Sequence, residues 1–140
     1  MGQTVSIFLD ANIIIYQVEA VAPFQQQVLR ELKELVREFP RSGFAVSRLS
    51  LLECLAKPVR EGNRNVIERY REFFSATDLR IVEVSAQVIE KALQLRASCG
   101  LRTPDAIQAA SAVILDEPHV FVTGDKAFAA VPGLTAHIVF

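Results

Sequence analysis

The chain has 140 residues, of which 51% are hydrophobic and 22% are charged, and its formal net charge is −1 at pH 7. A domain of this size buries about two-thirds of its unfolded surface, so we expect one domain over residues 1–140 that needs no disulfide to fold. This net charge does not indicate a nucleic-acid-binding domain, because such domains are usually markedly basic. Any contact with nucleic acid would therefore depend on local cations.

The cysteines, the histidines and the N-terminal residues narrow the class of protein further. Cys54 and Cys99 are not spaced as a CxxC pair, and we expect free thiols in a reducing, cytoplasmic compartment. Because the cysteines lack CxxC spacing and His119 and His137 are the only histidines, we expect no zinc site of the usual kind, which leaves oxygen ligands and hence Mg²⁺ or Mn²⁺. Residues 1–4 carry no lysine or arginine, and no apolar run approaches the roughly 18 residues of a membrane span. We therefore expect a soluble protein without a signal peptide.

Short apolar runs alternate with longer segments of helical period along the chain. Strands are predicted over residues 5–9, 43–46, 80–84, 119–122 and 136–139. Helices are predicted over residues 23–39, 48–55, 66–74 and 86–97, and from residue 103 onward. This alternation is typical of α/β domains with a parallel sheet.

Capping residues set the expected ends of two helices. Ser47 is expected to cap the N-terminus of the 48–55 helix, and Pro58 to end it, because proline cannot donate the helical hydrogen bond. Thr103 is expected as the N-cap of the last helix, with Pro104 at its first position. Asp105 then falls in the first turn, where the helix dipole favours an anion.

Four acidic residues lie where an apolar segment gives way to a turn or to a helix start. They are Asp10, Glu53, Asp105 and Asp125. Because the carboxyl ends of parallel strands form the ligand crevice of an open sheet, these positions can bring the four carboxylates together. Packed carboxylates repel one another, so their convergence implies either a divalent metal or strongly raised pKa values. Taken singly, three of the acids have structural explanations as helix or turn residues, and only Asp10 has none.

The motifs around these acids resemble those of the PIN-domain ribonucleases, and among them the VapC-type toxins of prokaryotic toxin–antitoxin systems. The resemblance covers nearly the whole chain. The matching segments, in chain order, are Phe8-Leu9-Asp10-Ala11-Asn12, Ser47 to Glu53, Thr103 to Ala110, and Val122 to Phe128. Each motif is short, and the resemblance depends on their order and spacing. One departure is Arg102, where many relatives carry a lysine before the Asp-Ala pair.

The resemblance implies a three-layer α/β/α sandwich around a parallel sheet of about five strands. The residues that it implies as catalytic Mg²⁺ or Mn²⁺ ligands are Asp10, Glu53, Asp105 and Asp125. The residues that it implies as their supports are Asn12, Thr123 and Ser47. We expect cations near these acids to bind substrate phosphates, and the candidates are Arg48, Arg102 and Lys126.

The implied function is metal-dependent hydrolysis of RNA phosphodiester bonds by an endoribonuclease, the toxin of a type II toxin–antitoxin system. The implied partners are RNA, a cognate antitoxin protein and a second copy of the chain. Apolar stripes on the 24–39 and 66–74 helices would help to form the antitoxin groove and a homodimer face. The RNA target, the number of metal ions, the antitoxin's identity and a role in RNA processing instead of toxicity all stay open.

Two other interpretations are compatible with an apolar strand that ends in aspartate. In a phosphatase of the haloacid-dehalogenase type, Asp10 would be a nucleophile instead of a metal ligand. That class usually has a second aspartate two residues later, where this chain has Asn12. The chain could also be a non-catalytic PIN-fold module that binds RNA or protein, although such modules commonly lose one or more of the acids. A nucleotide-binding protein is disfavoured, because the chain contains neither GxGxxG nor GxxxxGK[ST].

Overall fold

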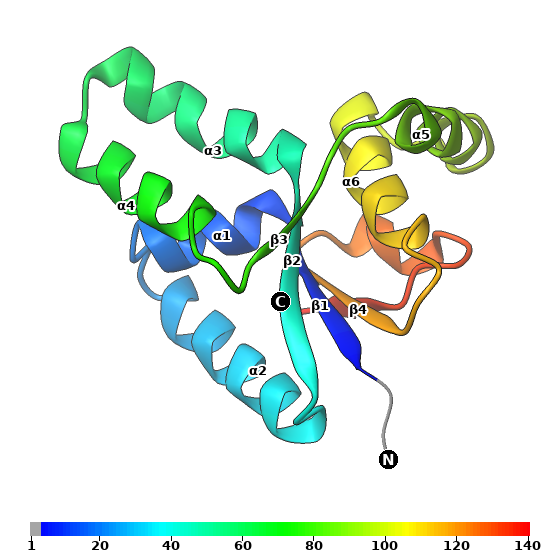
Figure 1. Cartoon of the computed structure of the whole chain (residues 1–140), viewed down its shortest axis with the longest axis horizontal. Coiled ribbons are helices and arrows are strands. Elements are labelled where there is room, and N and C mark those ends of the chain that lie inside the picture. Colours follow the sequence, from blue (N-terminus) through cyan, green and yellow to red (C-terminus); the bar gives the residue numbers. More distant parts are fainter. Residues whose placement is uncertain (1–3) are drawn as a thin grey trace.

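A computed structural model of the chain describes residues 4–140 and has a five-stranded parallel sheet at its centre (Figure 1). The strands are β1 (Val5–Leu9), β2 (Ser42–Ser47), β3 (Arg80–Val82), β4 (His119–Thr123) and β5 (Ala136–Ile138). Their order across the sheet is β3-β2-β1-β4-β5, and every neighbouring pair is parallel. All five carboxyl ends therefore meet at one edge. The parallel α/β fold predicted from the sequence is confirmed.

Helices cover both faces of this sheet. They are α1 (Ala11–Val18), α2 (Phe24–Glu38), α3 (Arg48–Glu61), α4 (Arg64–Phe74), α5 (Ala86–Cys99) and α6 (Thr103–Val113), with a short 3₁₀ helix η1 (Lys126–Ala130). The first four lie on one side of the sheet, and α5 and α6 lie on the other (Figure 1). This is the expected three-layer α/β/α arrangement. None of the described helices is both long and apolar enough to cross a membrane.

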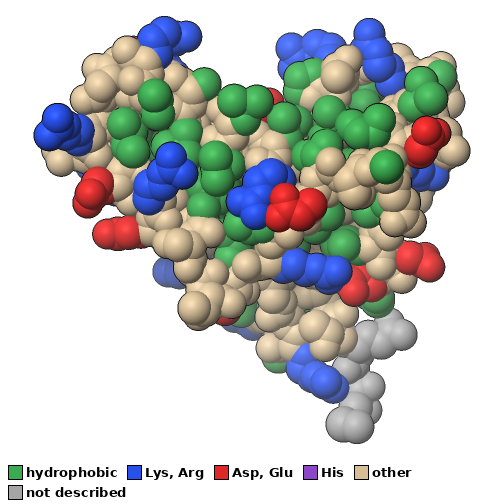
Figure 2. All heavy atoms as spheres, turned by 45° about the horizontal axis from the view of Figure 1, so that its top comes forward, with side chains coloured by type: hydrophobic (Ala, Val, Ile, Leu, Met, Phe, Trp, Pro, Cys, Tyr) green, Lys and Arg blue, Asp and Glu red, His purple; other side chains and the backbone are tan. Residues whose placement is uncertain are grey.

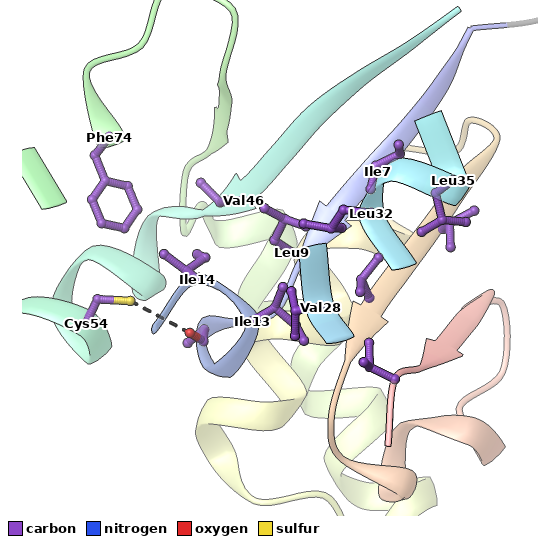
Figure 3. Close-up of a cluster of buried hydrophobic side chains, with 14 of the residues drawn as sticks. Ile7, Leu9, Ile13, Ile14, Val28, Leu32, Leu35, Val46, Cys54 and Phe74 are labelled. Carbon is purple, nitrogen blue, oxygen red and sulfur yellow. Dashed lines mark hydrogen bonds between the residues drawn. The ribbon is translucent and has the colours of Figure 1, made fainter. Parts of the chain in front are cut away.

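The core consists of two apolar clusters, one on each face of the sheet. Successive strand side chains point to opposite faces, so in β1 the residues Ile7 and Leu9 join one cluster and Phe8 joins the other. Figure 3 shows part of the first cluster, where β1 and β2 pack against α1, α2 and α3. In the second, Phe121 packs against the small residues of α6. Burial on both faces explains why the strands are continuous apolar runs instead of alternating ones.

Three details of the helices differ from the sequence prediction. Residues 11–18, to which no element was assigned, form α1. Pro58 does not end α3 but lies buried inside it, and the helix continues to a left-handed cap at Gly62 with φ of 66°. The N-cap of α6 is Arg102, in the extended conformation that precedes a helix, and Thr103 is the first helical residue.

Both thiols are free, as the sequence predicts, and Cys54 is buried. Its Sγ lies 3.9 Å from the main-chain oxygen of Ala11 (Figure 3). Burial raises the pKa of this thiol, and the charges of Glu53, Glu19 and Asp10 add to the effect in that order. Cys54 is therefore a neutral core residue that lies under the acidic edge of the sheet.

Candidate functional site

Asp10 follows β1 at the carboxyl edge of the sheet, and its side chain is buried with 6% exposure. Its Oδ1 accepts a hydrogen bond from the Ala11 main-chain N–H at 2.8 Å, which makes Asp10 the N-cap of α1. Its Oδ2 accepts from the Thr123 hydroxyl at 2.7 Å. The sequence offered no structural explanation for Asp10, and the structure supplies one, because this carboxylate caps a helix that the sequence pattern did not reveal.

The electrostatic surroundings of Asp10 show which acids converge on it. Its pKa is raised from 3.8 to about 6, mainly by burial, while the bonds from Thr123 and Ala11 oppose the rise. The negative charges of Glu53 and Asp105 raise the pKa further. Glu53 on α3 and Asp105 on α6 thus lie near enough to Asp10, at the end of β1, for their charges to act on its carboxylate. A raised pKa is one of the two outcomes that the sequence predicts for converging carboxylates, and burial is its main cause at Asp10.

Glu53 lies on an exposed position of α3, but a buried side chain restrains it. The Gln108 Nε2 donates a hydrogen bond to Glu53 Oε1 at 2.9 Å. Gln108 comes from α6, one turn after Asp105, and its side chain is 1% exposed. The Glu53 carboxylate is therefore held toward α6 instead of extending freely into solvent.

Asp105 lies in the first turn of α6, with only 17% of its side chain exposed. Its Oδ2 accepts a hydrogen bond from Arg102 Nε at 3.2 Å. The arginine is 79% exposed, so the pair is partly solvated and costs little to separate. Arg102 thus neutralises one acid of the group from the solvent side.

Asp125 is placed differently from the other three acids. Its Oδ1 accepts from the Ala127 N–H at 2.9 Å and so caps η1, and its own N–H donates to the Thr123 hydroxyl at 3.0 Å. It is absent from the charges that shift the pKa of Asp10. Thr123 links Asp125 to Asp10, since its hydroxyl donates a hydrogen bond to the Asp10 carboxylate and accepts one from the Asp125 main-chain N–H.

The other two predicted supports, Asn12 and Ser47, hold main chain at the same edge. The Asn12 Oδ1 accepts from the Gly124 N–H at 3.3 Å, which ties α1 to the end of β4. The Ser47 Oγ caps α3 by accepting from the Leu49 N–H at 3.1 Å, as the sequence predicts. These contacts fix the starts of the segments that carry the acids.

The three candidate phosphate-binding cations differ in availability. Arg48 makes two hydrogen bonds to the Glu83 carboxylate, at 2.9 and 2.6 Å, and these raise its pKa. Arg102 is paired with Asp105, as described. Lys126 is exposed and directly follows Asp125 in the chain. The structure therefore leaves Lys126 and the solvated Arg102 as the more accessible cations at this edge.

The acids suit a divalent cation in atom type and charge, but not yet in arrangement. Carboxylate oxygens are the ligands that Mg²⁺ and Mn²⁺ prefer, and a cation would relieve the negative field on Asp10. Within residues 4–140, no three Asp, Glu, His or Cys side chains are grouped to hold an ion as they stand. Asp105 faces Arg102 and Asp125 faces its own helix, so these side chains would have to turn for the donor set to close.

Gln108 is the site residue that the sequence motifs did not reveal. Glutamine is not a typical metal ligand, and the small residues around it suggested only close helix packing. A signal was available, however, because Asp105, Gln108 and Ser111 recur every three residues along the same side of α6. A polar side chain on the buried stripe of a helix usually has a specific partner.

A family model that describes the PIN domain matches residues 7–134 of this chain. No curated protein matched the chain in sequence. Among solved structures, the fold is similar to that of VapBC2 from Rickettsia felis bound to a promoter DNA fragment. In that match the TM-score is 0.75 and the identity 18%, over 96% of this chain and 98% of that one.

Two further solved structures have the same fold. A toxin–antitoxin complex from Klebsiella pneumoniae matches with a TM-score of 0.68 and 21% identity, over 96% of this chain and 98% of that chain. FitAcB from Neisseria gonorrhoeae matches with a TM-score of 0.70 and 19% identity, over 93% and 95% respectively. At such identities the likeness establishes the architecture, and the activity must be argued from the residues.

Proposed function

Because the chain belongs to the PIN domain family, we propose that it is a metal-dependent endoribonuclease that hydrolyses RNA phosphodiester bonds. The observation that carries this proposal is the convergence of Glu53 and Asp105 on the buried Asp10 at the carboxyl edge of the sheet. A carboxylate cluster is poorly suited to bind an RNA phosphate by itself, since both are anions. It is well suited to hold the cation that such a reaction uses.

The proposed ligands are Asp10, Glu53 and Asp105, with Asp125 as the ligand of a second ion. Bound Mg²⁺ or Mn²⁺ would activate water and neutralise charge on the phosphate. Asp10 is held by Thr123 and the Ala11 N–H, so its position is set before any ion binds. Arg102 and Lys126 would bind the non-bridging oxygens of the substrate, and in doing so Arg102 would release Asp105.

The family match disfavours the haloacid-dehalogenase alternative, which belongs to a different protein family. In that alternative Asp10 would form an aspartyl-phosphate. Trapping with beryllofluoride separates the two: the proposed nuclease should form no stable adduct on Asp10. The cleavage assay described next distinguishes the nuclease from a non-catalytic module.

We expect the purified protein to cleave a mixed RNA pool in Mn²⁺ or Mg²⁺, and Asp105→Asn to cleave it at least 100-fold more slowly. The variant keeps the shape of the side chain and removes a charge that the cation needs. The measurement is the initial rate of cleavage on a denaturing gel, with EDTA as the metal-free control. Equal rates for both proteins, or no cleavage in either metal, would contradict the nuclease assignment. Glu34→Gln is a matched control, because this exposed acid on α2 pairs, within residues 4–140, with Arg37 alone.

We also propose that the chain is the toxin of a toxin–antitoxin pair. The support is its fold, which is shared with chains from structures of toxin–antitoxin systems over nearly their full length. Expression in a bacterial host should then arrest growth, whereas expression of Asp105→Asn should not. Coexpression of a small protein from a neighbouring gene should relieve the arrest. Normal growth with active, soluble wild type would favour a role in RNA processing instead.

An apolar groove offers a place for the antitoxin. It has a volume of about 400 Å³ and lies between α1, α2 and the segment that joins α4 to β3. Its apolar lining includes Leu9, Ile14, Leu32, Phe44, Phe73 and Leu79. This is the region that the 24–39 and 66–74 helices were expected to form. We propose that an apolar side chain of the antitoxin inserts here, and the growth assay above tests whether such a partner exists.

For the homodimer, the exposed apolar residues favour a different face from the one expected. Four of the most exposed large hydrophobic residues lie on two helices: Leu52 and Val59 on α3, and Ile89 and Leu93 on α5. Figure 2 views the side that carries these helices, and hydrophobic side chains gather on both of its lobes. We propose this face as the dimer interface. Light scattering should then give a dimer mass for the wild type, and a monomer mass for Leu52→Glu combined with Leu93→Glu.

A further inference from the structure

A line of polar side chains runs between α3 and α6, where two packed helices usually present apolar ones. Ser47, the N-cap of α3, is followed at three-residue intervals by Ser50 and Glu53 on that helix, and Gln108 and Ser111 have the same spacing on α6. Gln108 Nε2 donates to Ser50 Oγ and to Glu53 Oε1, both at 2.9 Å, and Ser111 Oγ donates to Ser47 Oγ at 3.1 Å. We call Ser47, Ser50, Gln108 and Ser111 the α3–α6 seam. All four are buried, and the seam ends at the solvent-facing Glu53.

Gln108 is an unfavourable choice for a residue that only fills space. Its side chain is 1% exposed, and its Oε1 is buried without a hydrogen-bond partner among the described residues. A buried amide oxygen without a partner loses its hydration and receives nothing in return. Leucine or methionine would fill a similar volume without that cost. A reason other than packing is therefore needed for an amide at this position.

The orientation of the Gln108 amide shows which side chains it binds. Both N–H groups of Nε2 are occupied, one by Ser50 and one by the Glu53 carboxylate. The reverse orientation would place the carbonyl oxygen against an anionic oxygen, which is repulsive. The amide thus donates a hydrogen bond to the Glu53 carboxylate and leaves its own oxygen without a partner among the described residues. It is also not the only polar link between the two helices among the described residues, because Ser111 bonds to Ser47, the N-cap of α3, one turn away.

We propose that Gln108 is a positioning residue that holds the Glu53 carboxylate in place for the cation. The inference rests on the proposed metal-dependent function and adds a residue to its site. Glu53 is exposed and has a long, flexible side chain, so without a restraint it would sample solvent-facing rotamers. A bond from an immobile amide limits this sampling, and less conformational freedom is then lost when the ion binds.

The test measures Mn²⁺ binding directly, by electron paramagnetic resonance of the unbound ion. We expect Gln108→Met to bind Mn²⁺ about 10- to 100-fold more weakly than the wild type, the usual loss when an outer partner of a ligand is removed. Its thermal midpoint should stay close to that of the wild type, because methionine removes the unpaired Oε1 but also the hydrogen bond that Nε2 donates to the buried Ser50 hydroxyl. Ser111→Ala is the matched control: it removes a seam hydrogen bond that touches no carboxylate, and its Mn²⁺ affinity should change less than about twofold. Gln108→Leu serves as a second variant if methionine disturbs folding.

A double-substitution cycle separates positioning from a general structural effect. If Gln108 acts through Glu53, then Gln108→Met should weaken Mn²⁺ binding no further in a Glu53→Gln background. An equal loss in both backgrounds would mean that Gln108 acts on the structure at large, and wild-type affinity in folded Gln108→Met would refute the inference. Neither result would contradict the proposed nuclease function. Failure of the wild type to bind Mn²⁺ would instead overturn the metal-dependent function, and this inference with it.

Discussion

Replacing Asp10 by asparagine is expected to stabilise the metal-free protein at pH 7.5 by up to about 3 kcal/mol, while it abolishes cleavage of RNA. The stabilising part follows from the pKa of Asp10, which folding raises from 3.8 to about 6. Each pKa unit is worth about 1.36 kcal/mol, and about 3 kcal/mol is therefore the cost of keeping this carboxylate ionised in the folded chain. Asparagine carries no charge to desolvate, and its oxygen can still accept from the Ala11 N–H that Asp10 caps.

The pH dependence has a definite sign. Because the pKa is higher in the folded chain than in the unfolded one, the folded state binds more protons between about pH 4 and pH 6. The free energy of unfolding of the metal-free wild type should therefore fall, through this group, as the pH rises across that window. Asp10→Asn should lack this component. The difference between the two proteins should be small at pH 4, grow to pH 6 and then stay constant.

Urea unfolding in EDTA at several pH values measures this difference. Asp125→Asn is the control, because that carboxylate is only half-buried and caps η1, and its replacement should bring no gain in stability. Saturating Mn²⁺ should stabilise the wild type and not Asp10→Asn. A variant that is less stable than the wild type by the same amount at pH 4 and pH 7.5 would show that the Asp10 charge carries no folding cost.

Phe121→Ala should lower the free energy of unfolding by about 3–5 kcal/mol, a large part of the 5–15 kcal/mol typical of domains. Phe121 lies in the middle of β4 with 0% exposure. Its ring packs between Phe8 and Phe128, at centroid distances of 5.6 and 4.9 Å. Truncation would leave a cavity in the cluster under α6, because three rings fill that space together.

The measurement for this prediction is chemical denaturation at fixed pH, with Phe24→Ala as the control. Phe24 also packs against two rings, those of Tyr16 and Phe140, but it is 39% exposed. Its truncation should cost about 1 kcal/mol, since exposed apolar atoms lose little on removal. Equal losses for the two variants would mean that the cluster under α6 collapses around the cavity.

The strands and the edge at which the acids meet could be predicted from sequence, and the helix boundaries only in part. Strands buried on both faces are continuous apolar runs, so β1 and β4 are evident from composition alone. The α1 helix could not be predicted from the sequence, because Ile13, Ile14 and Ile15 are β-branched and eight residues are too few for a clear helical period. It forms because Asp10 caps it and because a parallel sheet requires a crossover at this point.

The partners of the charged residues could not be predicted, since they depend on tertiary placement. Arg48 and Glu83 are 35 residues apart in the chain, and they meet only because β2 and β3 are neighbours in the sheet. Gln108 reaches Glu53 only because α3 and α6 cross near the sheet edge. Sequence motifs singled out the acids as candidates, whereas the side chains that restrain them became visible only in the fold.

The strand order also determines when during synthesis this site can exist. β1 is made first, yet it lies in the middle of the sheet and pairs with β4, which is made more than a hundred residues later. Asp10 receives the Thr123 hydroxyl only when β4 has paired. A nascent chain that still lacks residues 119–123 outside the ribosome therefore has no assembled site. If the chain is the proposed nuclease, it cannot act on RNA until β4 has emerged from the ribosome and paired with β1.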